Sequence, residues 1–423
     1  ALNKIPKRIR HQTTVSIAAG TYGCAYISGF TIEYPTNATT GSYLNIVGGL
    51  SDVTPATGSA TGTFESGTAG ASSPVAFGTA TDNEATWTVN DLRGKYLVTT
   101  GGTGSGQTFP IASNTATVIT IVSSWATTPN ATTTFAIREP NVVINAACSR
   151  PATSDAAVSA ANGGGLYFAG NISDLLSTFS AINVSSMRFT NTTGRGLVLS
   201  GAARVKVNQL TVANTAAAPG VEILQGASLI VRKSVFTPAA GSIGITVGSI
   251  KDVINGTDIT GSIFVSGNTG LDLEGGGALI LNSSYFFGVR DAIKSAGGGS
   301  AGQSSVNTNI IDCNSVASSS GFSSLSSPVF VGFSAANNSI SNCTTAYHFS
   351  GPVFAVLSAI PSGAGNTTAI LANGGAKVKL ASGATVTGTT ELSIDGAGYT
   401  IAAMRAASPR AITDLTYGST VFE

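Results

Sequence analysis

The chain has 423 residues, of which 42% are apolar and only 10% are charged, and its formal net charge is +1. This balance excludes the strong basic field of a nucleic-acid-binding protein, and no apolar run approaches the ~18 residues of a membrane span, so neither nucleic acid nor membrane insertion is expected. Ordinary globular proteins carry about 25% charged residues, so this chain has little material for acid–base chemistry and favours a structural or contact role.

Residues 1–50 are expected to form an N-terminal cap and the first strands. The opening "ALNKIPKRIRH" contains Lys4, Lys7, Arg8 and Arg10. It is interpreted as the end of an amphipathic capping helix, with a basic arm as the alternative, and the missing initial Met predicts a fragment or a processed form. Segments such as "TVSIAAGTY" and "YLNIVGG" then alternate with a period of two, which predicts β-strands.

Residues 51–138 break this pattern. A stretch rich in Gly, Ser, Thr and Pro is followed by "TWTVNDLRGKYLVTT" and "QTFPIASNTATVITIVSSW", which hold both tryptophans, Trp87 and Trp125. Alternation at hairpin spacing predicts antiparallel strands. We therefore expect a small antiparallel β-module inserted into the first turns of a larger fold.

Residues 139–400 contain a tandem repeat. Similar segments open at Gly196, Gly220, Gly244 and Gly270, with spacings of 24, 24 and 26 residues. Each holds three short alternations separated by Gly, Asn, Ser or Thr, residues that permit left-handed backbone. Three strands per turn, repeated in tandem, predict a parallel β-helix over one continuous core, and the usual hand of parallel crossovers predicts a right-handed coil.

The repeat assigns three inward columns. They are Leu199, Ile223, Val247 and Leu273; Val205, Leu229, Val253 and Leu279; and Val212, Phe236, Ile259 and Phe286. Later turns are expected to start near Ala292, Gly321, Ala346 and Ala369, and an earlier one near Gly165, with residues 401–423 as a C-terminal tail. The rival fold is a β-sandwich, which would show turn signals every 8–12 residues. The expected fold class is therefore all-β, a right-handed parallel β-helix with an antiparallel insertion.

The four cysteines are scattered and form no CxxC pair, so neither a metal site nor any other cofactor is expected. The segments "IIDCNS" and "SISNCTT" place Cys313 and Cys343 at one strand position in neighbouring turns. Stacked strands bring such residues to ~4.8 Å, but their parallel Cβ vectors oppose the twist of a disulfide. Two buried free thiols are expected, with a disulfide as the alternative.

"TVSIAAGTY", the block from Trp87 to Trp125 and the following ladder resemble the pectin-lyase-like, right-handed β-helix proteins of tailed bacteriophages, which are tail-spike or virion-fibre components. The block is the more specific part, since the ladder alone fits any pectin-lyase-like protein. The resemblance implies a homotrimer in the virion, contact with other virion proteins and attachment to bacterial surface polysaccharide. Some members cleave that glycan and others are structural, and no catalytic motif is transferable.

Outward positions of the repeat supply the candidate site residues. One column holds Glu222, Asp272, Lys294 and His348, and Glu274 lies two residues beyond Asp272. Two strand spacings would separate Glu222 and Asp272 by roughly 9–10 Å, near the ~6.5–9.5 Å of an inverting glycosidase. The candidate catalytic residues are therefore Glu222, Asp272 and Glu274, and the candidate glycan-binding residues are Lys294, His348 and Tyr285. The alternative is a solvated face with an Asp272–Lys294 ion pair.

Three functions are compatible with these patterns. The scarcity of acids and exposed aromatics favours a non-enzymatic phage spike or fibre that attaches to host-surface glycan. The second function is a glycan depolymerase, a hydrolase or lyase, on the same scaffold. The third is a bacterial surface adhesin, which would share the β-helix but not the Trp87–Trp125 block.

Overall fold

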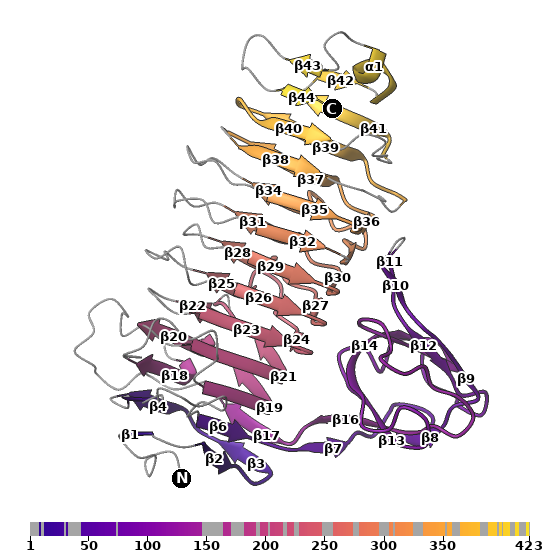
Figure 1. The fold of residues 1–423 in the computed structure, drawn as a ribbon, viewed down its shortest axis with the longest axis vertical. Helices are drawn as coiled ribbons and strands as arrows, with labels where there is room; N and C mark the ends of the chain where they lie inside the picture. Colours follow the sequence, from indigo (N-terminus) through magenta and orange to yellow (C-terminus); the bar gives the residue numbers. More distant parts are fainter. Residues whose placement is uncertain are drawn as a thin grey trace, which may run out of the picture.

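The structure is a computed structural model. It describes residues 8–9, 12–28, 31–32, 44–72, 75–145, 164–170, 182–191, 195–201, 204–214, 218–223, 228–247, 257–273, 279–295, 304–307, 309–324, 333–351, 353–357, 364–380, 388–395, 397–399, 401–406, 411–413 and 420–422. A tall stack of strands forms most of the molecule, and a smaller β-structure lies beside its lower half (Figure 1).

One face of the stack is a 12-stranded sheet in which every pairing is parallel except the last. Its strands are β4 (Ala25–Ser28), β18 (Gly164–Gly170), β20 (Arg195–Gly201), β22 (Val221–Ile223), β25 (Ile243–Val247), β28 (Thr269–Leu273), β31 (Asp291–Ser295), β34 (Ser320–Ser324), β37 (Thr345–Ser350), β39 (Thr368–Asn373), β41 (Thr390–Ile394) and β42 (Ala397–Tyr399). Leu199 pairs with Ile223, Ile223 with Val247 and Val247 with Leu273, and all four are buried. This register confirms the parallel β-helix and the first predicted inward column.

The other faces belong to a 20-stranded sheet. Its strands are β2 (Thr13–Ser16), β3 (Gly20–Tyr22), β6 (Leu44–Val47), β17 (Val142–Asn145), β19 (Ile182–Asn191), β21 (Arg204–Asn214), β23 (Ser228–Arg232), β24 (Val235–Phe236), β26 (Thr257–Thr260), β27 (Ile263–Val265), β29 (Leu279–Asn282), β30 (Tyr285–Phe287), β32 (Ser304–Asn307), β33 (Ile310–Asp312), β35 (Phe333–Ala336), β36 (Ser339–Ser341), β38 (Phe354–Leu357), β40 (Lys377–Leu380), β43 (Ala411–Thr413) and β44 (Thr420–Phe422). Only β43 and β44 pair antiparallel in it. The helix α1 (Ile401–Ala406) precedes β43, and a short pair joins β1 (Arg8–Ile9) to β5 (Thr31–Ile32). Arg8 and Ile9, in the segment expected to end a capping helix, are thus in a strand.

The same corner joins the two faces of this second sheet in successive turns. A residue with φ between 47° and 63° occupies it: Ser186, Gln209, Lys233, Gly261, Ser283 and Asn337. Next to the corner runs a ladder of buried polar side chains: Ser234, Ser262, Ser284, Asn309 and Asn338. Each accepts a backbone N–H from the preceding turn at 2.9–3.3 Å. The ladder satisfies donors that the corner removes from the sheet hydrogen bonding, at positions closed to water.

Two assignments to inward columns were wrong, although Ile259 itself is buried as predicted, in the column of Val231 and Leu281. Thr257 pairs with Leu229 and with Leu279, in the place expected for Val253, which lies outside the described residues. Phe264 takes the place expected for Ile259 and stacks between Phe236 and Phe286, with ring centroids 4.7 and 4.6 Å apart. Both errors are in one turn, because its first two inward strands are joined by a longer segment than in the turns before it.

The glycines that open the repeats are required for space rather than for left-handed backbone. A Cβ on Gly244 would lie 2.6 Å from the carbonyl oxygen of Gly270 and 3.0 Å from the ring of Phe264. A Cβ on Gly270 would lie 2.6 Å from the carbonyl oxygen of Ala292, and no left-handed φ occurs at either glycine. Close stacking of the turns therefore selects glycine at this position.

Cys313 and Cys343 form a disulfide, so the expectation of two free thiols was wrong. Asp312 pairs with Ser341, which places Asn342 rather than Cys343 opposite Cys313. Asn342 has a φ of 55° and lies beyond the end of β36, so the two cysteines are not an in-register strand pair. Their Cα atoms are 5.0 Å apart, and the argument from parallel Cβ vectors does not apply to them.

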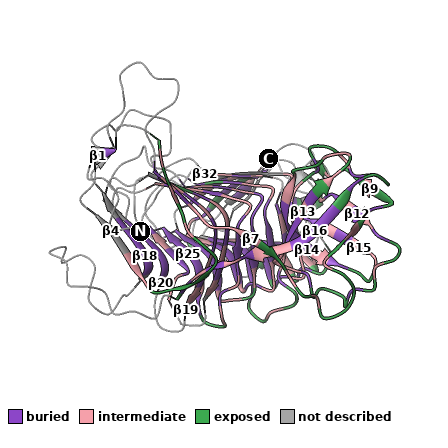
Figure 2. Cartoon of the chain, turned by 90° about the horizontal axis from the view of Figure 1, so that it is seen from below, coloured by how far each residue is buried: buried purple, intermediate pink, exposed green. Residues whose placement is uncertain are grey.

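The inserted module is antiparallel, as predicted, and its main sheet has eight strands. Its strands are β7 (Leu50–Asp52), β8 (Thr61–Thr63), β9 (Ser66–Thr68), β12 (Thr79–Thr81), β13 (Tyr96–Gly101), β14 (Thr108–Asn114), β15 (Val118–Ile121) and β16 (Thr134–Pro140), with a separate hairpin of β10 (Ala71–Ser72) and β11 (Val75–Ala76). Trp87 and Trp125 lie in its core, and their indole N–H groups donate to the carbonyl oxygens of Ser59 and Thr79. Buried segments run through both the stack and the module (Figure 2).

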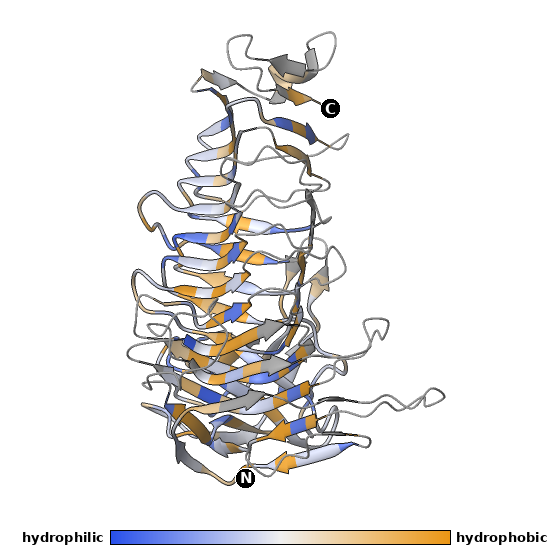
Figure 3. Cartoon of the chain, turned by 90° about the vertical axis from the view of Figure 1, so that its left-hand side faces the viewer, coloured by the Kyte–Doolittle hydropathy of each residue, from blue (hydrophilic) through white to orange (hydrophobic). Residues whose placement is uncertain are grey.

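Alternating hydropathy is visible along the strands of the stack (Figure 3).

We expect Ile223→Asn to destabilise the protein by about 3–5 kcal/mol, because it removes apolar contacts and buries an amide without a partner. The matched control is Ile280→Asn in β29, where the side chain is 45% exposed, and a change below about 1 kcal/mol is expected. Denaturant unfolding measures both, and equal midpoints for the two variants would contradict the inward assignment.

The disulfide is expected to stabilise the fold by about 3–4 kcal/mol, since it closes a loop with a sequence separation of 30. The double variant Cys313→Ala/Cys343→Ala should lose that amount in denaturant unfolding. Mass spectrometry of an alkylated, unreduced digest should recover the two cysteines in one linked peptide. Alkylation of both cysteines in the folded protein would show that the bond is absent.

Candidate functional site

The predicted outward column forms in register across β20 to β37. Successive partners are Val198, Glu222, Thr246, Asp272, Lys294, Ser323 and His348. We call these seven residues the outer column. It is not a solvated face, because Asp272 is only 3% exposed and Val198, Thr246 and Ser323 are also buried. Its half-buried members are Glu222, Lys294 and His348.

Glu222 is held by Arg195, at the start of β20. The Nη2 of Arg195 donates to Oε1 of Glu222 at 2.9 Å, and its Nε contacts Oε2. The two side chains are 13% and 12% exposed, so this ion pair is largely shielded from solvent. One hydrogen bond and one close charge contact thus join the guanidinium to this carboxylate, while Nε of Arg195 makes no hydrogen bond within the described part of the chain.

Asp272 is engaged on one oxygen only. Its Oδ2 lies 3.4 Å from Nζ of Lys294, which agrees with the predicted ion pair. Within the described part of the chain, neither Oδ1 of Asp272 nor Oγ1 of its strand partner Thr246 makes a hydrogen bond. Two buried oxygen atoms on neighbouring strands therefore have no hydrogen-bond partner.

The carboxylates of Glu222 and Asp272 do not face a common space in which a substrate could lie between them. The strand of Thr246 separates them, and each pairs with a different cation, on opposite sides of that strand. Glu274, the third candidate acid, lies outside the described residues. The described geometry therefore shows two ion pairs and no acid–base pair around a common space.

His348 ends the outer column beside Ser323. Burial lowers the pKa of its imidazole, and the charge of Asp291 opposes this shift in part. Asp291 is itself paired with Arg290 at 2.8 Å. The imidazole is therefore neutral near pH 7 and can accept or donate a hydrogen bond, as can the neighbouring hydroxyl.

Tyr285 lies in the contact between the module and the β-helix, not on an open face. It belongs to an apolar cluster with Tyr96 of the module and with Val235 and Ile263 of the helix. The ring of Phe77 meets it edge-on at 5.9 Å, and burial raises the pKa of its phenol to about 12. Its ring is therefore covered, and it holds the module in place.

Two cation–π contacts also join the module to the β-helix beside Tyr285, and we call this whole contact the seam. The Arg93 guanidinium of the module lies 3.7 Å from the ring centroid of Phe287, and the Lys233 ammonium of the helix lies 4.6 Å from that of Phe109. The hydroxyl of Tyr96 also donates to the carbonyl oxygen of Leu210 at 3.0 Å. Sequence reasoning missed the seam, although the run Tyr285 to Phe287 placed aromatic side chains on both sides of one strand.

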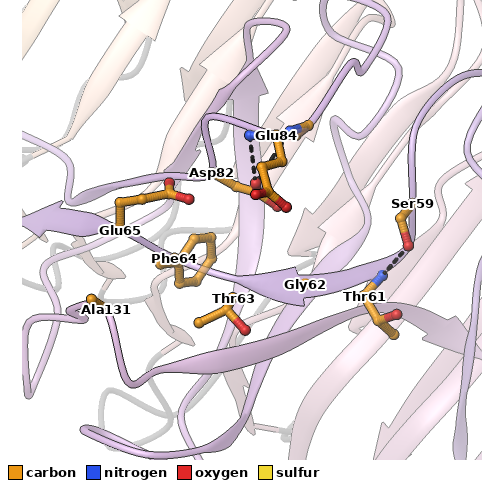
Figure 4. Close-up of a pocket in the computed structure, with 10 residues that line it drawn as sticks. Ser59, Thr61, Gly62, Thr63, Phe64, Glu65, Asp82, Glu84 and Ala131 are labelled. Carbon is orange, nitrogen blue, oxygen red and sulfur yellow. Dashed lines mark hydrogen bonds between the residues drawn. The ribbon is translucent and has the colours of Figure 1, made fainter.

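The module contains a pocket of about 460 Å³ (Figure 4). Its lining includes the carboxylates of Glu65, Asp82 and Glu84. Asp82 is buried and accepts the backbone N–H groups of Glu84 and Ala85 on Oδ1. No sequence pattern indicated this site, because its residues come from β8 and the residues that flank it, from the turn after β12, and from Ala131.

Among the described residues, no helix is long and apolar enough to cross a membrane. The same part of the chain holds no group of three or more His, Cys, Asp or Glu side chains arranged to bind a metal ion.

No family model matches the sequence, and no curated protein matches it. Among solved structures, similarity is found to the tailspike protein gp49 of Pseudomonas phage LKA1, with 12% identity, 92% of this chain and 72% of that chain covered, and a TM-score of 0.24. The tailspike gp61 of Pseudomonas phage phi297 shows 9% identity, coverage of 90% and 70%, and a TM-score of 0.23. The gp54 tailspike of Acinetobacter baumannii bacteriophage AP22, solved in complex with A. baumannii capsular saccharide, shows 9% identity, coverage of 87% and 71%, and a TM-score of 0.17. At these scores the likeness supports no statement about activity, and the β-helix assignment depends on the strand register of this chain alone.

We expect Arg195→Leu to destabilise the protein by about 3 kcal/mol, because it leaves the shielded carboxylate of Glu222 without its cation. The double variant Arg195→Leu/Glu222→Leu should recover most of that loss. The control is Arg138→Leu, which breaks an exposed pair with Asp52 and should cost less than about 1 kcal/mol. Denaturant unfolding measures all three, and an unchanged Arg195→Leu variant would contradict a structural role for the pair.

Proposed function

We propose that this chain is a bacteriophage tail-spike or fibre component that attaches to bacterial surface glycan. The observation that carries the proposal is the combination of a parallel β-helix with the Trp87–Trp125 module docked against it. The β-helix alone is shared by many pectin-lyase-like proteins, and the module is the more specific part of the resemblance noted in the sequence. This combination disfavours a bacterial adhesin, which would share only the helix.

The contacts between the module and the β-helix support a role for the module in transmitting force during attachment. Aromatic packing, two cation–π contacts and a buried hydrogen bond fix the module against five successive turns of the helix, from Leu210 to Ile310. Such contacts hold the module as a rigid extension of the shaft, so that force on one part is passed to the other. We place the protein in the virion tail, as a homotrimer in contact with other virion proteins.

The outer column supports glycan contact without cleavage. Lys294 and His348 are two of its three half-buried members, and both can hydrogen-bond to sugar hydroxyls, Lys294 while it remains paired with Asp272. The carboxylates of Glu222 and Asp272 are each paired with a cation, Arg195 and Lys294 respectively. Hydrolysis would need one carboxyl free to give a proton and a second free to activate water or attack the sugar.

The test is to incubate the full chain with capsule or O-antigen prepared from the phage's host. Surface-immobilised glycan should bind the protein, and Lys294→Ala/His348→Ala should weaken binding at least tenfold. Lys206→Ala, an exposed lysine on another face, is the control and should bind like the parent. New reducing ends in the glycan would overturn the non-enzymatic assignment in favour of a depolymerase, and no binding to any host glycan would overturn the attachment role.

A further inference from the structure

The outer face of the 20-stranded sheet carries a cluster of aromatic and basic side chains near the C-terminal end of the stack. The cluster lies on β38, β40 and β44, which pair in this order (Figure 1). In β40 the two apolar residues are buried in the core, so Lys377 and Lys379 point outward, and both are exposed. The flanking strands present Phe354 and Phe422 on the same side, both half-buried. We call these four residues the lysine–phenylalanine patch.

The two phenylalanine rings of the patch lean toward each other across β40. Phe354 is the strand partner of Lys377 and Phe422 is that of Lys379, so the rings start from strands on opposite sides of β40. Two strand spacings amount to ~9.6 Å, yet the ring centroids are only 6.3 Å apart. The rings therefore form one partly exposed aromatic surface that crosses β40 beside both lysines.

The positive charge of the patch is not compensated within the described part of the chain. Neither Lys377 nor Lys379 forms an ion pair with a described residue, and β38, β40, β43 and β44 contain no Asp or Glu. The residue after β44, Glu423, lies outside the described residues. Nearer the N-terminal end of the same sheet, Arg232 is by contrast paired with Asp258. Two exposed ammonium groups on one strand therefore attract an anionic partner.

Aromatic rings beside unpaired cations match the chemistry of an acidic sugar. The C–H face of a sugar ring packs on an aromatic ring, and a carboxylate on that sugar pairs with an ammonium group. A neutral sugar would use only the rings, and an acidic peptide would use only the lysines. Single-stranded nucleic acid uses both features, but a chain with a net charge of +1 lacks the wider basic field that its binding requires.

We propose that the lysine–phenylalanine patch binds a uronic acid unit of an acidic polysaccharide. Phe354 and Phe422 would contact the sugar ring, and Lys377 and Lys379 would pair with the carboxylates of neighbouring units. This site is separate from the outer column, which lies on the 12-stranded sheet. That the polysaccharide belongs to a bacterial surface rests on the proposed function, whereas the recognition of a uronic acid does not.

The experiment titrates the full chain with a β-1,4-linked mannuronate hexamer and with β-1,4-mannohexaose, which differ at the carboxylate. Calorimetry at low salt should detect mannuronate binding at least tenfold tighter than that of the neutral sugar. Lys377→Gln/Lys379→Gln should abolish this difference, and Lys377→Arg/Lys379→Arg should keep it because the charge is retained. Lys206→Gln is the matched control, since Lys206 is exposed on the same sheet but has Asn183 and Ile230 as strand partners.

The aromatic contact is tested separately by Phe354→Leu. This variant should weaken the binding of both sugars by about fivefold, because a ring is lost while both charges stay. Circular dichroism and thermal unfolding check that every variant folds like the parent.

Equal binding of the two sugars, or unchanged binding by Lys377→Gln/Lys379→Gln or by Phe354→Leu, would overturn the proposal. Hexaglutamate that binds as tightly as the mannuronate hexamer would also overturn it, in favour of general anion binding, and a thymidine decamer that binds more tightly would do so in favour of nucleic acid. Lys294→Ala/His348→Ala should leave this titration unchanged. The glycan-adsorption test and this one can therefore fail independently.

Discussion

The parallel register between successive turns is the constraint on which the rest of this structure depends. Every inward side chain must lie directly over an inward side chain of the turn before, because backbone hydrogen bonds between turns fix the position of each strand. Extra residues in a turn can therefore only enter between strands. This rule produces three features of the structure: the column from Leu199 to Leu273, the phenylalanine stack at Phe264, and the Ser/Asn ladder at the corner.

The same rule explains how much of the fold was predictable. The glycines at 24- and 26-residue spacing and the inward column through Ile223 are local patterns, and both were found correctly. Val253 and Ile259 were misplaced because counting from a glycine cannot show which gap in a turn has lengthened. The disulfide was missed for a related reason: the register offset at Asn342 depends on backbone conformation outside the strands, which the letters of the sequence do not encode.

The functional residues were less predictable than the fold. The sequence placed Glu222, Asp272, Lys294 and His348 in one column correctly, but it could not show that Arg195 would reach Glu222 from the neighbouring strand. Tyr285 was expected on an open face because the docking of the module over β30 involves residues more than 150 positions away. The pocket around Asp82 depends on three separate segments of the module and carries no periodic signal at all.

The disulfide between Cys313 and Cys343 links two neighbouring turns and encloses one whole circuit of the helix, including β34. In a stack where each turn contacts only its neighbours, tension along the chain would normally peel off one turn after another. Here the enclosed segment is bypassed, because the load passes through the covalent bond. An extended chain spans at most ~3.4 Å per residue, so a pulling force cannot extend about 100 Å of chain while the bond is intact. Under the proposed attachment function, a shaft closed in this way would stretch less before it fails.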